Sequence, residues 1–362
     1  MTDNIQSFAD TPQGYRGGVS PELSRKIAVL SFLAMVSVVY IHHNAIGTSN
    51  PATWNAVAQG FLTRGLTDWA VPFFFVVSGF WFARGAYMQG RQGFVQLWMK
   101  KARTLLVPYL LWAVIGAAIV LPVIVFNNHV TQRPLFSRTM FGHDSLWGFV
   151  DALVGVAGNG PQGNLALWYV RTLLIFFLLA PAWRVLVRCG KGVLLGLGLV
   201  LALGLPETWI PHTGLKFGSF GWLLLGMGAA DWMAADRRLP HGATIACGVA
   251  WAGLALAKAM GVSYGLERLI PLAGILFFWS VADWANLCCD FMKPTFWVYC
   301  LHGALAAYFL SGPLFVFGKG DVSTFLIMLL MPWANLAFCL AAAHAARRFA
   351  PRVYALLTGG RG

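Results

Sequence analysis

The stretch LSRKIAVLSFLAMVSVVYIHH, residues 23–43, decides the fold class of this chain. No charged residue occurs between Ile27 and Ile41. A helix needs about 20 consecutive, mostly apolar residues to cross the hydrocarbon core of a bilayer. The stretch therefore predicts a membrane helix over residues 27–47. Two adjacent histidines, His42 and His43, lie near its far end, where ionisable side chains are costly unless they face a polar interior.

The composition extends this prediction to the whole chain. Of the 362 residues, 58% are hydrophobic and 11% are charged, whereas soluble proteins are roughly 45–50% apolar and about 25% charged. The 16 Trp and 27 Phe residues suit the aromatic belts of membrane proteins. We expect an all-α polytopic membrane protein, a bundle of about ten transmembrane helices at residues 27–47, 69–83, 105–126, 165–183, 192–206, 215–232, 243–261, 268–287, 294–312 and 322–346.

The distribution of basic residues predicts the orientation. The net charge of +13 does not point to a nucleic acid partner, because the charges lie in short loops between apolar segments. With the N-terminus in the cytoplasm, 18 of the 26 Lys and Arg residues fall on that side and six on the other, which favours two cytoplasmic termini. We expect tails at 1–26 and 347–362 around a membrane domain at 27–346. The first tail lacks the pattern of a cleaved signal peptide.

The longest outward connection, residues 127–164, contains His129, His143 and Trp147. Its middle, SLWGFVDALVG at 145–155, predicts a short helix lying in the membrane interface. Loops of this length are usually functional or disordered. We interpret this one as a cap that faces a substrate.

Several polar residues converge on one predicted depth. His42 lies 16 residues beyond Lys26, or about 24 Å along the helix axis. Arg171 lies six residues into its own span from the outer side, and Asp68 and Arg64 lie where the second span leaves the outer surface. The pattern predicts a polar site in the outer half of the bilayer. The alternative is that the histidines are a polar pair near the lipid headgroups.

Other charged or polar residues allow two explanations. Lys100, Lys101 and Arg103 directly precede the third span, so they are either a positive-inside anchor or a docking patch for an anionic cytosolic ligand. His302 is predicted near the midplane, as a core histidine or as part of the site. Lys258 lies near the end of its span and is expected to snorkel to the interface. The six cysteines lack metal-ligand spacing, so we expect neither a metal nor disulfides.

Five stretches, in this order, resemble the acyltransferase family 3 membrane proteins, which O-acylate sugars of bacterial surface glycans. The first of these stretches resembles the family's first helix, which ends in an essential histidine, and His42 occupies that position here. The family's arginine eleven residues earlier is replaced by Ser31, and Arg25 and Lys26 are candidates to substitute for it. A second arginine common in the basic run is replaced by Thr104. The stretches are LSRKIAVLSFLAMVSVVYIHH, DWAVPFFFVVSGFWFARG, KKARTLLVPYLLW, LWYVRTLLIFFLLAP and FWVYCLHG.

The resemblance implies an O-acyltransferase of the bacterial cytoplasmic membrane. It would move an acyl group, acetyl or alternatively succinyl, from cytosolic acyl-CoA to a hydroxyl of a cell-surface or lipid-linked glycan. A neutral imidazole suits the role of base, so we expect His42 to take the hydroxyl proton or, alternatively, to carry the acyl group itself. The other expected roles are Asp68 orienting His42, Arg171 stabilising the thioester carbonyl, Lys100, Lys101 and Arg103 binding the donor, and His43, Arg64, Trp168 and His302 contacting substrate.

Two other classes of function fit a polytopic chain. A transporter or flippase for a glycan or lipid-linked sugar would also have many helices and an interior arginine. A membrane sensor or scaffold would not need a histidine and an arginine at one depth. No internal repeat of the kind found in many transporters is visible, and no Gly-rich phosphate loop points to ATP hydrolysis.

Overall fold

The computed structural model describes residues 19–44, 53–126, 145–155, 160–204, 216–262 and 265–361. The tail residues 1–18, the predicted end of the first span at 45–47, and His129 and His143 lie outside the described residues. Within the described ranges the chain is helical and contains no strand. This confirms the all-α class. The main helices are α1 (Pro21–Ile41), α2 (Trp54–Arg64), α3 (Ala70–Ala83), α4 (Phe94–Lys101), α5 (Val107–Phe126), α6 (Leu146–Val154), α7 (Trp168–Leu178), α8 (Ala180–Arg188), α9 (Lys191–Leu199), α10 (Phe217–Gly228), α11 (Ala230–Ala234), α12 (His241–Ala259), α13 (Ile270–Ser280), α14 (Thr295–Phe317), α15 (Asp321–Phe349) and α16 (Pro351–Thr358).

Each of the ten predicted apolar segments contains a helix, but not every helix is long enough to cross a membrane. Among the described residues four helices meet the length and composition needed, and up to six if each bent pair counts as one span. The bends are 64° between α7 and α8 and 58° within α14. Ten crossings and two cytoplasmic termini therefore stay predictions. The four helices are Pro21–Ile41, Phe94–Pro122, His241–Ala259 and Asp321–Phe349.

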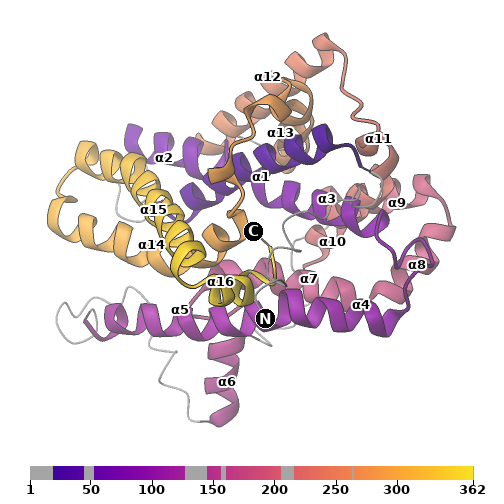
Figure 1. The fold of residues 1–362 in the computed structure, drawn as a ribbon. Helices are drawn as coiled ribbons and strands as arrows, with labels where there is room; N and C mark the ends of the chain where they lie inside the picture. The colour runs from indigo at the N-terminus through magenta and orange to yellow at the C-terminus, as the bar shows by residue number, and fades with distance from the viewer. Residues whose placement is uncertain are drawn as a thin grey trace.

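The third predicted span begins earlier than the hydropathy indicates. Helix α4 continues through a π-helical segment, Ala102–Leu106, directly into α5. Figure 1 shows α4 and α5 along the lower edge of the view, with α6 extending away from them. A π segment inside an α-helix is rare and occurs frequently at functional sites. Here it places Arg103 inside the segment and Lys100 and Lys101 in the turn before it.

The helix predicted at 145–155 is present as α6. The Ser145 hydroxyl accepts a hydrogen bond from the Gly148 amide at 3.1 Å, and Gly155 ends the helix with a φ of 66°. A positive φ of this kind is the usual reason for glycine after a helix C-terminus. Leu146 and Trp147 are exposed, as expected of side chains that insert into an interface.

Helix α2 was not predicted, because its apolar content is low. Its buried face instead carries a row of polar residues spaced four apart: Asn55, Gln59, Thr63 and, just beyond the helix, Thr67. The Gln59 amide donates to Asn55 at 2.9 Å, and the two threonine hydroxyls donate to backbone carbonyls four residues earlier at 2.8 Å. Each buried polar group thus has a partner, which allows a polar face to pack in the interior.

The most extensive contact between helices joins α3 and α10, which lie side by side in Figure 1. It depends on two glycines that face the opposing backbone. A Cβ atom on Gly79 would lie 2.0 Å from the Leu223 carbonyl oxygen, and one on Gly226 would lie 1.9 Å from that of Val76. Small residues let helices approach closely in a bilayer, where packing replaces the hydrophobic effect.

We therefore predict that Gly226→Ala destabilises the protein, because no flexible side chain can move out of the way. The expected loss is about 1–3 kcal/mol or more, the range for overpacking. Gly253→Ala in α12 is the matched control, since a Cβ there meets nothing within 4 Å, and Ala favours helix over Gly. The measurement is the melting temperature of both purified variants in one detergent. Equal melting temperatures would contradict this account of the α3–α10 contact.

Candidate active site

Three histidines predicted from the sequence lie together in the structure. His42 is the C-terminal cap of α1, and its ring centroid lies 5.2 Å from that of His302 on α14, with 61° between the ring planes. His43 and His302 are fully buried, whereas His42 is partly exposed. Helix α1 packs against both α14 and α15. The histidine cluster, defined as His42, His43 and His302, is therefore formed by helices far apart in sequence.

Asn335 on α15 connects this cluster. Its amide nitrogen lies 3.1 Å from the His302 carbonyl oxygen and 3.2 Å from His43 Nε2, and its oxygen accepts from the Cys339 thiol at 3.3 Å. These contacts fix which end of the amide is the donor, so His43 Nε2 accepts. His43 Nδ1, 2.7 Å from the Val39 carbonyl oxygen, then carries the proton and donates it. Both ring nitrogens of His43 are engaged within the protein.

His302 has a different environment. Its Nδ1 lies 3.0 Å from the Val298 carbonyl oxygen, which accepts a proton but cannot donate one. Nε2 therefore carries the lone pair, and it is buried without a hydrogen-bond partner among the described atoms. A buried acceptor without a partner is costly and is uncommon enough in folded proteins to require an explanation.

An aromatic layer extends from His302 toward the second-helix motif. The Tyr299 ring lies 6.2 Å from that of His302 and 5.8 Å from that of Tyr169. The Tyr169 hydroxyl lies 2.9 Å from the Ser78 hydroxyl and 3.1 Å from the Phe74 carbonyl oxygen. Ser78 belongs to the FF-x-x-SG stretch, so three of the stretches singled out in the sequence meet here.

A cavity of about 360 Å³ lies beside the end of α1 and is lined in part by Ile41, the residue before His42. Trp168, Trp222 and Phe75 contribute aromatic surface to its wall. Its polar lining comes from Asp68, Lys258, Ser219, Glu267 and Arg268. Two residues predicted from the sequence as site residues, Asp68 and Trp168, therefore line one cavity.

The Lys258 side chain was expected to snorkel to the interface, but it forms an ion pair with Asp68 across the cavity wall. Asp68 thus has a partner on α12, and Arg64, an exposed residue at the end of α2, lies within electrostatic range of it. Arg171 is buried on α7, where its charge acts on Tyr109 and Asp151. The described interactions of Arg171 therefore lie toward α5 and α6, and those of His42 toward α14.

The basic residues near the start of α5 differ in exposure. Lys100 and Arg103 are exposed, and the Lys101 ammonium lies 3.9 Å from the centroid of the Phe177 ring. Lys26, a candidate to replace the arginine missing at Ser31, is buried, with its ammonium 2.5 Å from the Asp236 carboxylate and 4.3 Å from the Trp279 ring centroid. Lys26 is thus engaged at the start of α1, at the opposite end from His42.

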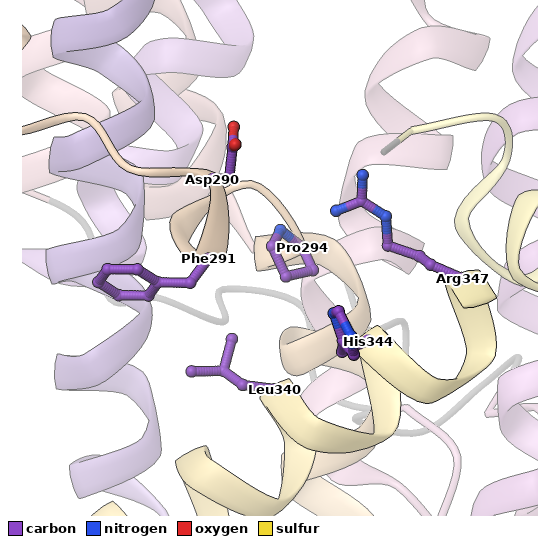
Figure 2. A pocket seen from close by; sticks show the side chains of 6 residues that line it. All are labelled: Asp290, Phe291, Pro294, Leu340, His344 and Arg347. Atoms are coloured by element: carbon purple, nitrogen blue, oxygen red, sulfur yellow. The ribbon is translucent and has the colours of Figure 1, made fainter.

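A second, smaller cavity of about 170 Å³ lies between the segment before α14 and the end of α15. Figure 2 shows His344 and Arg347 on α15, with Asp290 on the facing segment. A hydrogen bond from Lys293 lowers the pKa of the Asp290 carboxyl, so it is ionised at neutral pH. His344 therefore belongs to an environment separate from the histidine cluster.

The family model described as an acyltransferase domain matches residues 26–344. The chain belongs to this acyltransferase family. The chain is also 24% identical over 369 residues to the succinoglycan biosynthesis protein ExoH of Rhizobium meliloti (strain 1021), across 94% of this chain and 93% of that protein. No solved structure matches the chain significantly.

In this acyltransferase the structure groups most of the predicted residues into three places: the histidine cluster, the cavity with Asp68 and Trp168, and the basic turn before α5. Arg64 and Arg171 belong to none of these three places. Within the described part of the chain, no group of three His, Cys, Asp or Glu residues is arranged to hold a metal. Sequence analysis missed Asn335, Trp222 and Ser219. Asn335 had a usable signal, because an amide in the middle of an apolar helix needs partners.

Proposed function

We propose that this acyltransferase moves an acyl group from cytosolic acyl-CoA to a hydroxyl group of a surface or lipid-linked glycan at the bacterial cytoplasmic membrane. One observation carries the proposal: His42 lies at the end of the first membrane helix, in contact with His302, and the residue before it, Ile41, lines a cavity suited to a sugar. Family membership supplies the reaction class. The name of the similar protein, a succinoglycan biosynthesis protein, supports an extracellular polysaccharide as the acceptor.

The proposed chemistry uses His42 as a general base. Its ring nitrogen takes the proton from the acceptor hydroxyl as the oxygen attacks the thioester carbonyl. The carbon–sulfur bond then breaks, and the proton passes from the imidazolium to the departing sulfur, giving an ester and free CoA. In the alternative, the His42 nitrogen attacks first and holds the acyl group before passing it on. Arg171 is assigned to stabilise negative charge on the carbonyl oxygen.

The cavity beside Ile41 supports a sugar as the acceptor. Its volume of about 360 Å³ suits a small number of sugar rings. Aromatic rings such as those of Trp168 and Trp222 present flat apolar faces on which a sugar ring can lie. Asp68 and Ser219 offer acceptors and donors for hydroxyl groups. Arg64 is assigned to the acceptor side as well, whereas His43, predicted from the sequence to contact substrate, has both ring nitrogens bonded within the protein and is assigned to supporting the histidine cluster.

The basic turn before α5 supports a nucleotide-bearing donor. Lys100 and Arg103 are exposed, so their charges are accessible to the phosphates of acyl-CoA. Lys101 is assigned to the same group, closer to the interior. With these residues on the cytoplasmic side and His42 toward the outer side, the pantetheine arm would extend into the bundle. Acetyl is the proposed acyl group, with succinyl as the alternative.

We predict that His42→Gln lowers acyl transfer about 10²–10⁴-fold, the contribution expected of a positioned base. The measurement is the amount of ester-linked acyl group on the surface polysaccharide of an expressing host, determined by NMR at matched membrane levels of protein. His344→Gln is the matched control and should retain wild-type ester. Equal ester from His42→Gln and wild type would remove His42 from the mechanism, and polysaccharide export without any acyl donor would favour a transporter instead.

We predict that the double substitution Lys100→Glu/Arg103→Glu weakens acyl-CoA binding about tenfold or more, equivalent to about 1.4 kcal/mol, because repulsion replaces attraction. Binding is measured by calorimetry on the protein in nanodiscs at two salt concentrations. The control is Arg91→Glu/Arg188→Glu, which produces the same change in net charge at two other exposed arginines on the predicted cytoplasmic side. An affinity equal to that of the control would contradict the docking role.

A further inference from the structure

We propose that His302 is the positioning residue for His42: its Nε2 accepts a hydrogen bond from a ring N–H of His42 and so holds the base in one tautomer. This inference rests on the proposed function, since it explains how the base is prepared for its task. It assigns His302 a role through His42 rather than through the substrate. The proton of this hydrogen bond stays on His42, and the opposite nitrogen of His42 is left free to act on the acceptor hydroxyl.

The tautomer of His302 makes its Nε2 an acceptor. Nδ1 lies 3.0 Å from the Val298 carbonyl oxygen, four residues earlier in the same helix. A carbonyl oxygen only accepts hydrogen bonds, so Nδ1 carries the hydrogen and Nε2 carries the lone pair. Nε2 is buried and has no partner among the described atoms, and the residue is 0% exposed. The buried Nε2 of His302 therefore needs a hydrogen-bond donor.

The other hydrogen-bond donors close to His302 already have acceptors. The Asn335 amide nitrogen has two hydrogens, which point to the His302 carbonyl and to His43 Nε2. The Tyr299 hydroxyl donates to the Ala166 carbonyl, and the Cys339 thiol donates to Asn335. His43 uses its single ring hydrogen on the Val39 carbonyl. The His42 ring, in contact with His302, is a neighbouring donor that none of these hydrogen bonds engages.

The two rings are also close enough for a hydrogen bond. The rings of His42 and His302 are in edge contact, with centroids 5.2 Å apart. The χ2 torsion of histidine has a broad energy minimum. At this separation, rotation of the His42 ring about that torsion can direct one of its N–H groups toward the His302 ring. His42 is the C-cap of α1 and lies beyond its last regular turn.

This arrangement differs from the one in which a carboxylate orients the histidine. Asp68, the carboxylate expected in that role, is paired with Lys258. A neutral imidazole acceptor avoids placing a further charge in the interior, where an unpaired charge is costly. The site then contains two separate pairs. His42 and His302 supply the base and its positioning residue, and Asp68 and Lys258 form part of the cavity wall.

Two nearly isosteric substitutions separate this role from a structural one. In His302→Asn, the side-chain amide can replace the Nδ1–H bond to Val298 but places nothing at the position of Nε2. In His302→Gln, the side-chain oxygen can take the position of Nε2. We expect kcat to fall about 10–100-fold in His302→Asn, as when other partners that orient a histidine are removed, and to recover substantially in His302→Gln, with both KM values within twofold of wild type. A wild-type kcat in His302→Asn, or equal losses with a raised acceptor KM in both variants, would overturn the proposal.

A second measurement does not depend on acyl transfer. In protein labelled with ¹⁵N-histidine and held in lipid, solid-state NMR can detect a nitrogen–nitrogen coupling across an N–H···N hydrogen bond. The proposal predicts such a coupling between His42 and His302 in wild type and its loss in His302→Asn. No coupling in folded wild-type protein would overturn the proposal even if the enzyme is active. A coupling in a protein that forms no ester would uphold the histidine pair while contradicting the proposed function.

Discussion

The amide of Asn335 is the interaction on which the arrangement of the histidine cluster depends. It joins three helices: α15, which carries it, α1 through the His43 ring, and α14 through the His302 carbonyl. In an apolar interior such a group is stable only when its hydrogen-bonding capacity is used. The amide is fully buried, and its three contacts involve both the amide nitrogen and the amide oxygen. Because His43 is held, its neighbour His42 is placed at the edge of the cluster, against His302.

The same principle separates the parts of the site. Polar groups occur where other helices supply partners: the row on α2, the Asp68–Lys258 pair at the cavity wall, and the histidines beside Asn335. Tyr299 and Tyr169 pack in series against His302, and Phe75, which packs against Tyr169, also lines the cavity. Apolar and aromatic walls around a base limit access by water, which would otherwise compete with a glycan hydroxyl for the acyl group.

Hydropathy predicted much of this architecture. The apolar segments, the short helix α6 and the choice of His42 and His302 as candidate site residues came from patterns that a single stretch can reveal, whereas the contact between the two histidines was not predicted. Helix α2 could not be predicted in this way, because its buried face is polar and becomes acceptable only when the amides and hydroxyls pair with one another. The Lys258–Asp68 pair joins residues 190 positions apart, and no local pattern indicates such a contact. The roles of His43 and His302 depend on tautomers, which follow from Asn335 and Val298 rather than from the sequence around each histidine.

The central claim is that an acyl group passes from a donor on the side of the basic turn to an acceptor on the side of His42. The most direct test is a sidedness assay in proteoliposomes of defined orientation, with ¹⁴C-acetyl-CoA supplied to one face and a glycan acceptor to the other. The account predicts labelled ester when acetyl-CoA meets the face that carries Lys100 and Arg103 and the acceptor meets the opposite face. Label transferred only when donor and acceptor share a face would contradict it.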